Sequence, residues 1–248
     1  MSQNRWVREA RTGHGSTVVE YPPNLRFEIT YLTDPDIHAA VLPPPLTPAP
    51  EPRVRVHFTR IEVDGKLHEI VNSFLLDAMY GDTLGQFCAV MPIDLETAVS
   101  SSRETYGEPK KLAELTFERE GDHLDLSVAR QGVTFIEVVG DVTEQLAVPE
   151  PYEVVQFWYK FLPAVSGEGF DAGPFLVTLH QTVKPRSCEK VEGKLVLRDL
   201  PGTPVADLPV LQQEGARLMM IQTDYYHVLE NVEIDPVEYA KHVSVQYS

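Results

Sequence analysis

Two adjacent lysines, Lys110 and Lys111, follow a proline near the middle of the chain. A lysine amine attacks a ketone only in its unprotonated form, and in water at neutral pH nearly all of it is protonated. Burial of the amine, or a second cation beside it, shifts the balance toward the free base. Lys110 has a cation as its immediate neighbour, and a largely apolar stretch follows from Leu112 to Phe117. These features suit a lysine that forms a Schiff base.

The segment from Arg103 to Lys111 has the pattern Arg-Glu-x-x-Gly-x-Pro-Lys-Lys. This pattern resembles the active-site segment of the acetoacetate decarboxylase family. Further stretches resemble landmarks of that family in the same order: 31–34, 41–46, 85–87, 93–94, 160–163 and 188–193. The resemblance covers nearly the whole chain. It implies that Lys110 forms the imine and that Lys111 helps to activate it.

The lysine specifies covalent carbonyl chemistry but leaves the reaction open. A free amine at Lys110 would attack a ketone and lose water, which gives a protonated imine that withdraws electrons. A carboxylate on the next carbon can then leave as CO2. Alternatively, the imine can lose a proton and add to an aldehyde, which is aldolase chemistry. Adjacent side chains of a strand point to opposite faces, so we expect Lys111 to lie away from Lys110.

The resemblance also implies which acidic and basic residues surround the lysine. A pocket glutamate of the family best matches Glu69, with Asp77 or Asn72 as alternatives because of two inserted residues. Arg103 could receive a substrate carboxylate in a bidentate fork. Arg103 could equally pair with Glu104 or Glu108 and hold the loop.

Several positions depart from the family pattern. Decarboxylases of the family have an arginine where this chain has Asn24, and we expect the nearby Arg26 to point elsewhere. A pocket glutamate is replaced by His57, and the aromatic residue before the proline of the motif is replaced by Glu108. These changes keep open a catalytically silent protein that binds a small molecule.

Tyrosines occupy two positions that matter in family members that condense and dehydrate pyruvate. Tyr106 lies four residues before the lysine, and the pair Tyr225 and Tyr226 lies near the C-terminus. Tyr106 or Tyr226 could shuttle protons together with Glu69 or Glu108. Each tyrosine could instead be a strand aromatic with a solvated hydroxyl.

Composition narrows the class of partner. The chain of 248 residues has 21 basic and 37 acidic residues, a formal net charge of −16, which argues against binding to nucleic acid or to anionic membranes. The N-terminus has no apolar signal-peptide core, and no window reaches 18 apolar residues. The two cysteines, Cys88 and Cys188, suggest buried thiols in a reducing compartment. We therefore expect a cytoplasmic protein that requires no cofactor. No metal site is expected either, since no histidine or cysteine spacing matches one.

Period-two patterns dominate the chain and predict a mainly β protein, in the α+β class, with an antiparallel barrel or sandwich and a few short helices. Asp64-Gly65 predicts a hairpin turn after the strand that begins near Val54. Helical patterns occur only at 34–42, 150–161 and 235–242, and the middle one is ambiguous. Residues 1–20 are expected to be a loose arm, and 21–248 a single domain. The edges of so many strands need cover, and the family forms homo-oligomers, so we expect one here.

Together these observations predict a Schiff-base-forming lyase of the acetoacetate decarboxylase type that acts through Lys110 on a small β-keto acid or related oxo acid. The alternatives are a pyruvate aldolase-dehydratase that uses the same lysine and the silent binding protein.

Overall fold

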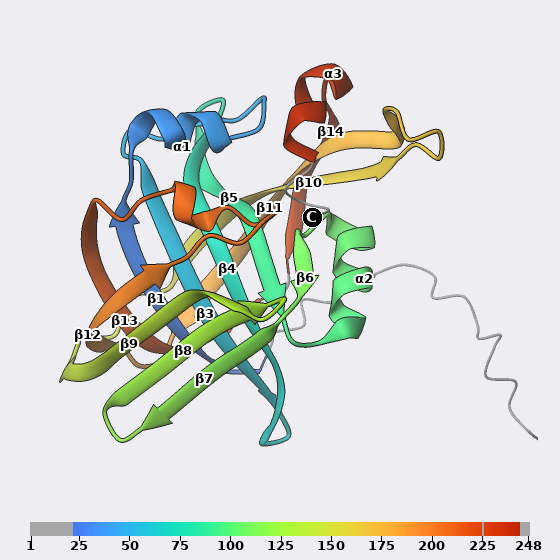
Figure 1. The fold of residues 1–248 in the computed structure, drawn as a ribbon. Coiled ribbons are helices and arrows are strands. Elements are labelled where there is room, and N and C mark those ends of the chain that lie inside the picture. Colours follow the sequence, from blue (N-terminus) through green and yellow to red (C-terminus); the bar gives the residue numbers. More distant parts are fainter. Residues whose placement is uncertain (1–21, 225, 244–248) are drawn as a thin grey trace, which may run out of the picture.

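The computed structural model describes residues 22–224 and 226–243, so the predicted arm at 1–20 and Tyr225 lie outside the described residues. The described part contains fourteen strands in one mixed sheet and three short helices (Figure 1). The strands are β1 (Asn24–Leu32), β2 (Thr47–Pro48), β3 (Arg53–Val63), β4 (Lys66–Tyr80), β5 (Thr83–Ile93), β6 (Lys110–Leu112), β7 (Glu114–Glu120), β8 (His123–Arg130), β9 (Val133–Gln145), β10 (Tyr152–Pro163), β11 (Phe170–Pro185), β12 (Glu189–Leu197), β13 (Gln212–Thr223) and β14 (His227–Glu233). The helices are α1 (Pro35–Val41), α2 (Glu96–Tyr106) and α3 (Pro236–Tyr239), with 3-10 turns at Val205–Asp207 and Ala240–His242.

The sheet curls and forms two layers, so the predicted mainly β fold is confirmed in a sandwich-like form. Its order is β14-β11-β10-β5-β4-β3-β1-β13-β12-β9-β8-β7, and an additional pairing joins β11 to β13. Most neighbours are antiparallel, whereas β5 is parallel to both β10 and β6. Strands β7, β8 and β9 fold across the face of β1, β3 and β4 (Figure 1).

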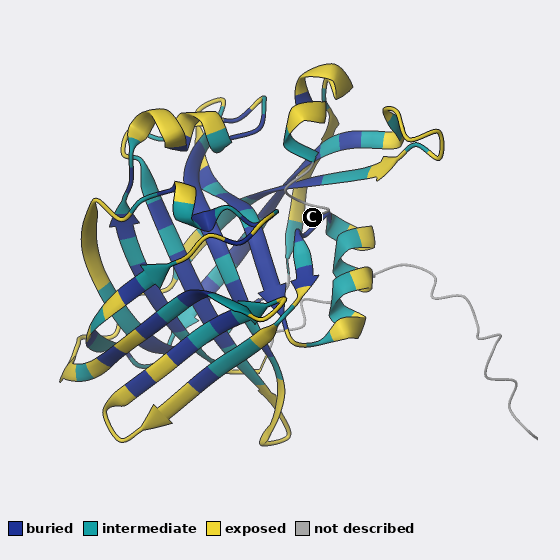
Figure 2. Cartoon of the chain, in the orientation of Figure 1, coloured by how far each residue is buried: buried dark blue, intermediate teal, exposed yellow. Residues whose placement is uncertain are grey.

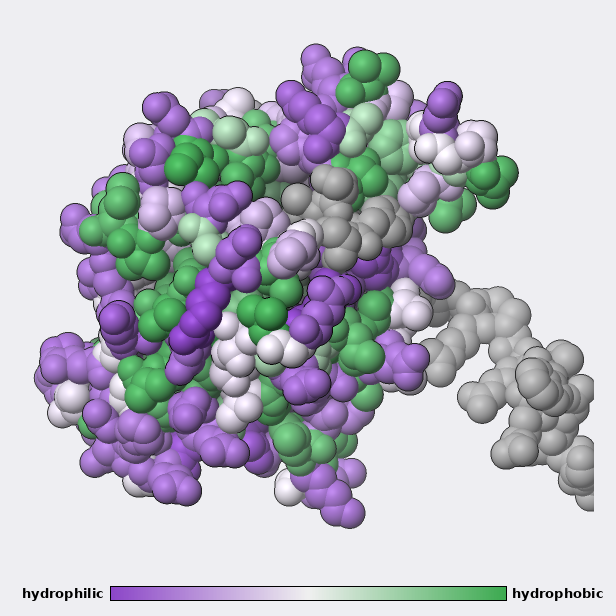
Figure 3. Space-filling model, in the orientation of Figure 1, coloured by the Kyte–Doolittle hydropathy of each residue, from purple (hydrophilic) through white to green (hydrophobic). Residues whose placement is uncertain are grey.

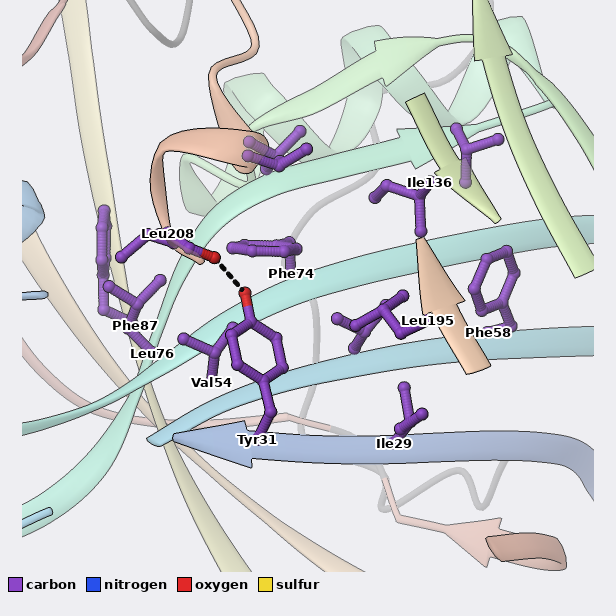
Figure 4. Packing of buried hydrophobic residues seen from close by; sticks show 14 of the residues in the cluster. Ile29, Tyr31, Val54, Phe58, Phe74, Leu76, Phe87, Ile136, Leu195 and Leu208 are labelled. Atoms are coloured by element: carbon purple, nitrogen blue, oxygen red, sulfur yellow. Dashed lines mark hydrogen bonds between the residues drawn. The ribbon is translucent and has the colours of Figure 1, made fainter. Parts of the chain in front are cut away.

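The main hydrophobic core lies between these two layers. Phe27, Ile29 and Tyr31 of β1 belong to the same buried cluster as Ile136 of β9 and Leu195 of β12. Figure 4 shows Ile136 and Leu195 above Ile29, and the Tyr31 hydroxyl donating a hydrogen bond of 3.0 Å to the Leu208 carbonyl. Burial alternates along β8 (Figure 2), as the period-two patterns predicted, and on β1 the core residues Phe27, Ile29 and Tyr31 alternate with Arg26, Glu28 and Thr30. The opposite face of the sheet is therefore free to carry polar side chains.

Local signals account for the turns and for the first helix. Asp34 accepts hydrogen bonds from the backbone N–H groups of Asp36 and Ile37 and so caps α1, with Pro35 in the first turn. Asp64 and Gly65 have φ angles of 53° and 71° and connect β3 to β4, as a hairpin turn of this sequence requires. Both predictions are confirmed, as is the helical pattern at 235–242, which forms α3 and a 3-10 turn.

The sequence analysis assigned one element wrongly and missed another. The stretch 150–161 is not helical, because its residues form most of strand β10. Helix α2 was not predicted from the sequence. Its N-cap residue, Leu95, makes no side-chain cap hydrogen bond, and the helix buries no residue, so it has neither of the two features by which a helix is recognised in a sequence.

The outer surface is largely hydrophilic. Hydrophilic side chains cover much of the face seen in Figure 3, and the hydrophobic residues there form separate small patches. None of the helices in the described ranges is long and apolar enough to cross a membrane.

Candidate active site

The segment between α2 and β6 fixes the position of the lysine pair. Gly107 ends α2 in the left-handed conformation, with φ of 81°, and its N–H donates to the Arg103 carbonyl at 3.0 Å. A Cβ atom at Gly107 would lie 2.5 Å from the Tyr159 carbonyl oxygen, so only glycine fits there. Beyond it, β6 pairs with β5, and Lys110 is the Cα partner of Met91.

The pleat of β6 sends its two lysines in opposite directions, as predicted. The Lys110 side chain enters a cavity of about 270 Å³. The Lys111 amine lies outside that cavity and donates to the Gly202 carbonyl at 3.2 Å. A small molecule in the cavity can therefore reach the Lys110 amine but not the Lys111 amine.

The cavity lies on the polar face of the curled sheet. Strands β1, β3, β4, β10, β11 and β13 contribute lining residues, and α2 contributes Ser101, Ser102, Thr105 and Tyr106. The structure brings together five of the predicted site residues here: Glu69, Tyr106, Glu108, Lys110 and Tyr226.

Lys110 has two close polar partners inside the cavity. Its Nζ atom lies 2.8 Å from Glu108 Oε2 and donates a hydrogen bond of 2.9 Å to Ser102 Oγ. The side chain of Lys110 is 12% exposed and that of Glu108 only 4%, so water screens this ion pair little. Glu108 is thus within proton-transfer distance of the amine.

Glu69 is the acidic residue of β4 that reaches the cavity. Burial raises the pKa of Glu69, and the nearby positive charge of Lys110 partly opposes the increase. The two alternatives lie elsewhere. Asp77 forms a bidentate pair with Arg55, at 2.7 and 2.8 Å, and the Asn72 amide donates to the His57 carbonyl at 3.0 Å.

Tyr106 and Tyr226 form one wall of the cavity around a buried tryptophan. The Trp158 ring lies 5.9 Å from the Tyr106 ring and 4.9 Å from the Tyr226 ring, centroid to centroid, both edge to face. The two tyrosine rings are 5.9 Å apart. Aromatic packing of this kind fixes the orientation of both tyrosines next to the bound molecule.

Strand β1 contributes Arg26, whose side chain was expected to point away from the site. Arg26 lines the cavity, and its Nε donates to Thr59 Oγ1 at 3.3 Å. The prediction for Arg26 was wrong because Asn24 and Arg26 are two residues apart on β1, and such residues share a face. Both line the cavity.

His57 links the cavity to a buried group of charges. Its Nε2 lies 3.1 Å from Glu28 Oε2. Burial lowers the pKa of His57, which the carboxylate of Glu28 opposes. For Glu28, burial acts to raise the pKa, but His57, Arg217 and Arg55 together lower it well below its ordinary value.

Arg103 does not line the cavity. Its Nη1 donates to the Lys110 carbonyl at 3.1 Å, and the residue lines a separate groove behind α2 together with Lys160. This position supports the alternative in which Arg103 holds the loop, rather than contact with the substrate.

Some residues of the site escaped the sequence analysis. Ser102 was missed because α2 was missed, although Ser102 and Tyr106 are four residues apart and would share a helix face. Trp158 was hidden in the stretch read as helical. Among residues 22–224 and 226–243, no group of three His, Cys, Asp or Glu side chains could hold a metal ion.

The buried amine of Lys111 should make stability depend on pH. Burial lowers the pKa of Lys111 to about 8, and the charges of Arg130 and Arg103 add to the decrease. The folded protein therefore binds fewer protons than the unfolded chain between about pH 8 and the ordinary lysine pKa near 10.4, so this group adds stability as pH rises through that window.

We expect Lys111→Met to gain stability relative to the wild type at pH 7, and to lose that gain at pH 10.5. The change in the difference should be about 1–3 kcal/mol, measured by urea unfolding at both pH values. Lys194→Met, at an exposed position of β12, is the matched control. A difference between Lys111→Met and wild type that is the same at both pH values would contradict this account.

Comparison with known proteins gives a consistent result. The family model described as "Acetoacetate decarboxylase (ADC)" matches residues 7–232. An acetoacetate decarboxylase of Burkholderia vietnamiensis is 30% identical over 200 residues, which cover 76% of this chain and 78% of the relative.

Solved structures share the fold. The acetoacetate decarboxylase of Legionella pneumophila is similar with a TM-score of 0.76 and 21% identity, covering 93% of each chain. The enduracididine biosynthesis enzyme MppR, complexed with the condensation product of pyruvate and imidazole 4-carboxaldehyde, has a TM-score of 0.66 and 15% identity, covering 94% of each chain.

Proposed function

Because the chain belongs to the acetoacetate decarboxylase family, we propose that it is a carbon–carbon lyase that forms a Schiff base between Lys110 and a small β-keto acid or related oxo acid. One observation carries the proposal. The Lys110 amine projects into a cavity and lies 2.8 Å from the carboxylate of Glu108, while the adjacent lysine points away.

The proposed reaction begins with a proton transfer from the Lys110 ammonium to Glu108. The free amine attacks the ketone, and Glu108 returns the proton so that the carbinolamine loses water. The carboxylate then leaves as CO2, and its bonding electrons pass into the enamine. Glu69, or Glu108 after it takes up a proton from water, protonates the enamine carbon to give an iminium, and water hydrolyses the iminium to release the ketone and restore the Lys110 ammonium. The sum is a β-keto acid anion plus one proton giving a ketone and CO2.

Arg26 can hold the substrate carboxylate before it leaves. A guanidinium binds a carboxylate through paired hydrogen bonds, and Arg26 lines the same cavity as Lys110. Since an ion pair that is tight in the ground state opposes the loss of charge, a single cation at the cavity wall suits this role.

A second candidate is a pyruvate aldolase-dehydratase that uses the same lysine. Two tyrosines and two carboxylates line the cavity beside Lys110, and they could move protons to and from an enamine. MppR, which shares the fold, is complexed with a condensation product of pyruvate and an aldehyde.

The assay that tests the proposal measures CO2 release from acetoacetate beside ultraviolet detection of an unsaturated product from pyruvate plus an aldehyde. We expect CO2 release that depends on Lys110. A conjugated product without CO2 release would establish the second candidate. If neither reaction occurs with any small oxo acid, the protein is the silent binding protein.

A further inference from the structure

The cavity contains two buried oxygen atoms that the proposed reaction does not use. Among the described residues, Asn24 Oδ1 and Gln156 Oε1 have no hydrogen-bond partner. Asn24 is only 5% exposed, and both residues line the cavity that holds Lys110. A buried acceptor without a partner is unfavourable, so native proteins satisfy nearly all of them through protein, water or ligand.

These acceptors project from strands other than those that carry Lys110 and Glu69. Lys110 and Glu69 project from β6 and β4, whereas Asn24 belongs to β1 and Gln156 to β10. Strands β11 and β13 connect β10 to β1, because β11 pairs with β10 on one side and with β13 on the other. Their lining residues Gln181 and Thr223 are also polar, so this wall, here called the amide wall, is polar across all four strands.

The amide wall differs from the region around Lys110 in the kind of group it can bind. The reacting residues Glu69, Glu108 and Lys110 are ionisable, whereas Asn24, Gln156, Gln181 and Thr223 carry amides and a hydroxyl, with Arg26 two residues from Asn24 on β1. Gln181 already donates to the Asp224 carbonyl at 3.0 Å, which leaves the oxygens of Asn24 and Gln156 as the open positions. A carbonyl oxygen accepts hydrogen bonds and repels a carboxylate, so these positions favour a group that donates hydrogen bonds.

Resting on the proposed Schiff-base function, we propose that the natural substrate is an oxo acid with a hydroxyl or N–H donor on the chain beyond the ketone, and that Asn24 and Gln156 accept hydrogen bonds from this donor. The cavity of about 270 Å³ equals roughly nine water molecules at about 30 Å³ each. It therefore has room for a longer chain than that of acetoacetate, whose terminal methyl group would leave both acceptors unsatisfied.

The test compares two pairs of compounds that differ only in a terminal hydroxyl. The first pair is 2-oxohexanoate and 6-hydroxy-2-oxohexanoate, which report imine formation through borohydride trapping and mass spectrometry. The second pair is hexanoate and 6-hydroxyhexanoate, which have no ketone and report binding alone by calorimetry. We expect the hydroxylated member of each pair to be favoured about tenfold, because a site built for a polar group rejects the analogue that lacks it.

Variants assign the preference to the two amides. Asn24→Leu and Gln156→Met keep similar side-chain volumes and remove the acceptors, so the double variant should lose the preference in both pairs. Ser73→Ala, which changes another lining residue, should keep it. If no oxo acid is trapped but 6-hydroxyhexanoate is still favoured, the proposed function fails and the amide wall stands. Equal binding within the carboxylate pair, or no binding of either, overturns the inference and indicates that water satisfies both oxygens.

Discussion

Lys110→Met should abolish turnover, lowering kcat/KM for an accepted oxo acid by about 10⁴-fold or more, because the proposed pathway has no other reachable amine. The substitution removes the Nζ atom and its contacts to Glu108 and Ser102 while keeping an unbranched side chain of similar length. Steady-state kinetics and borohydride trapping with peptide mapping provide the measurement.

The adjacent lysine provides the control for this loss. The Lys111 amine points away from the cavity, so Lys111→Met should still form a reducible imine at Lys110. Label on Lys111 in the wild-type protein, or full activity of Lys110→Met, would contradict the assignment of the nucleophile.

Glu108→Gln should lower kcat by about 10²–10⁴-fold, the range typical of a lost general acid–base group. The amide keeps the shape of the side chain and its position 2.8 Å from the amine, but it cannot take a proton. The rate of imine formation separates this role from a purely structural one. The variant should still bind the oxo acid but form the borohydride-trapped imine more slowly than the wild type.

Glu104→Gln tests whether any charge change near α2 has the same effect. Glu104 belongs to α2 and lines the groove behind the helix instead of the cavity, so its variant should keep near-normal kcat. Glu108→Phe, which introduces the residue type that the resemblance to the family implies at this position, separates the proton-transfer role from packing. A Glu108→Gln variant with wild-type kcat and a wild-type rate of imine formation would refute the role of Glu108.

Regular local patterns made much of the fold predictable. The period-two run of β3 describes a strand with one apolar face, Asp64-Gly65 predicted the hairpin turn that follows it, and the pattern at 34–42 predicted α1. Strand β10 was misread because most of its residues are apolar or aromatic on both faces, which hides the alternation. Helix α2 was missed because its place depends on tertiary contacts, such as the approach of Gly107 to Tyr159, that no local pattern records.

Some residues of the candidate site could be predicted from the sequence, and others could not. The motif identified Lys110, and the hairpin register brings Glu69 rather than Asp77 to it. Arg26, Ser102 and Gln156 come from three separate elements, and only the tertiary fold places them around one cavity. The resemblance could not reveal the pairing of Glu108 with Lys110, because Glu108 is a departure from the family pattern.

Strand β6 is only three residues long, yet its alignment with β5 decides which of two chemically identical amines faces the cavity. A slip of one residue turns every side chain of a strand to the other face, and here it would exchange Lys110 for Lys111. The left-handed turn at Gly107 and the hydrogen bond from the Met91 N–H to the Pro109 carbonyl oppose that slip. The position of the reactive group is therefore encoded in the spacing between a helix end and a strand, and a deletion of one residue there would change it without altering either lysine.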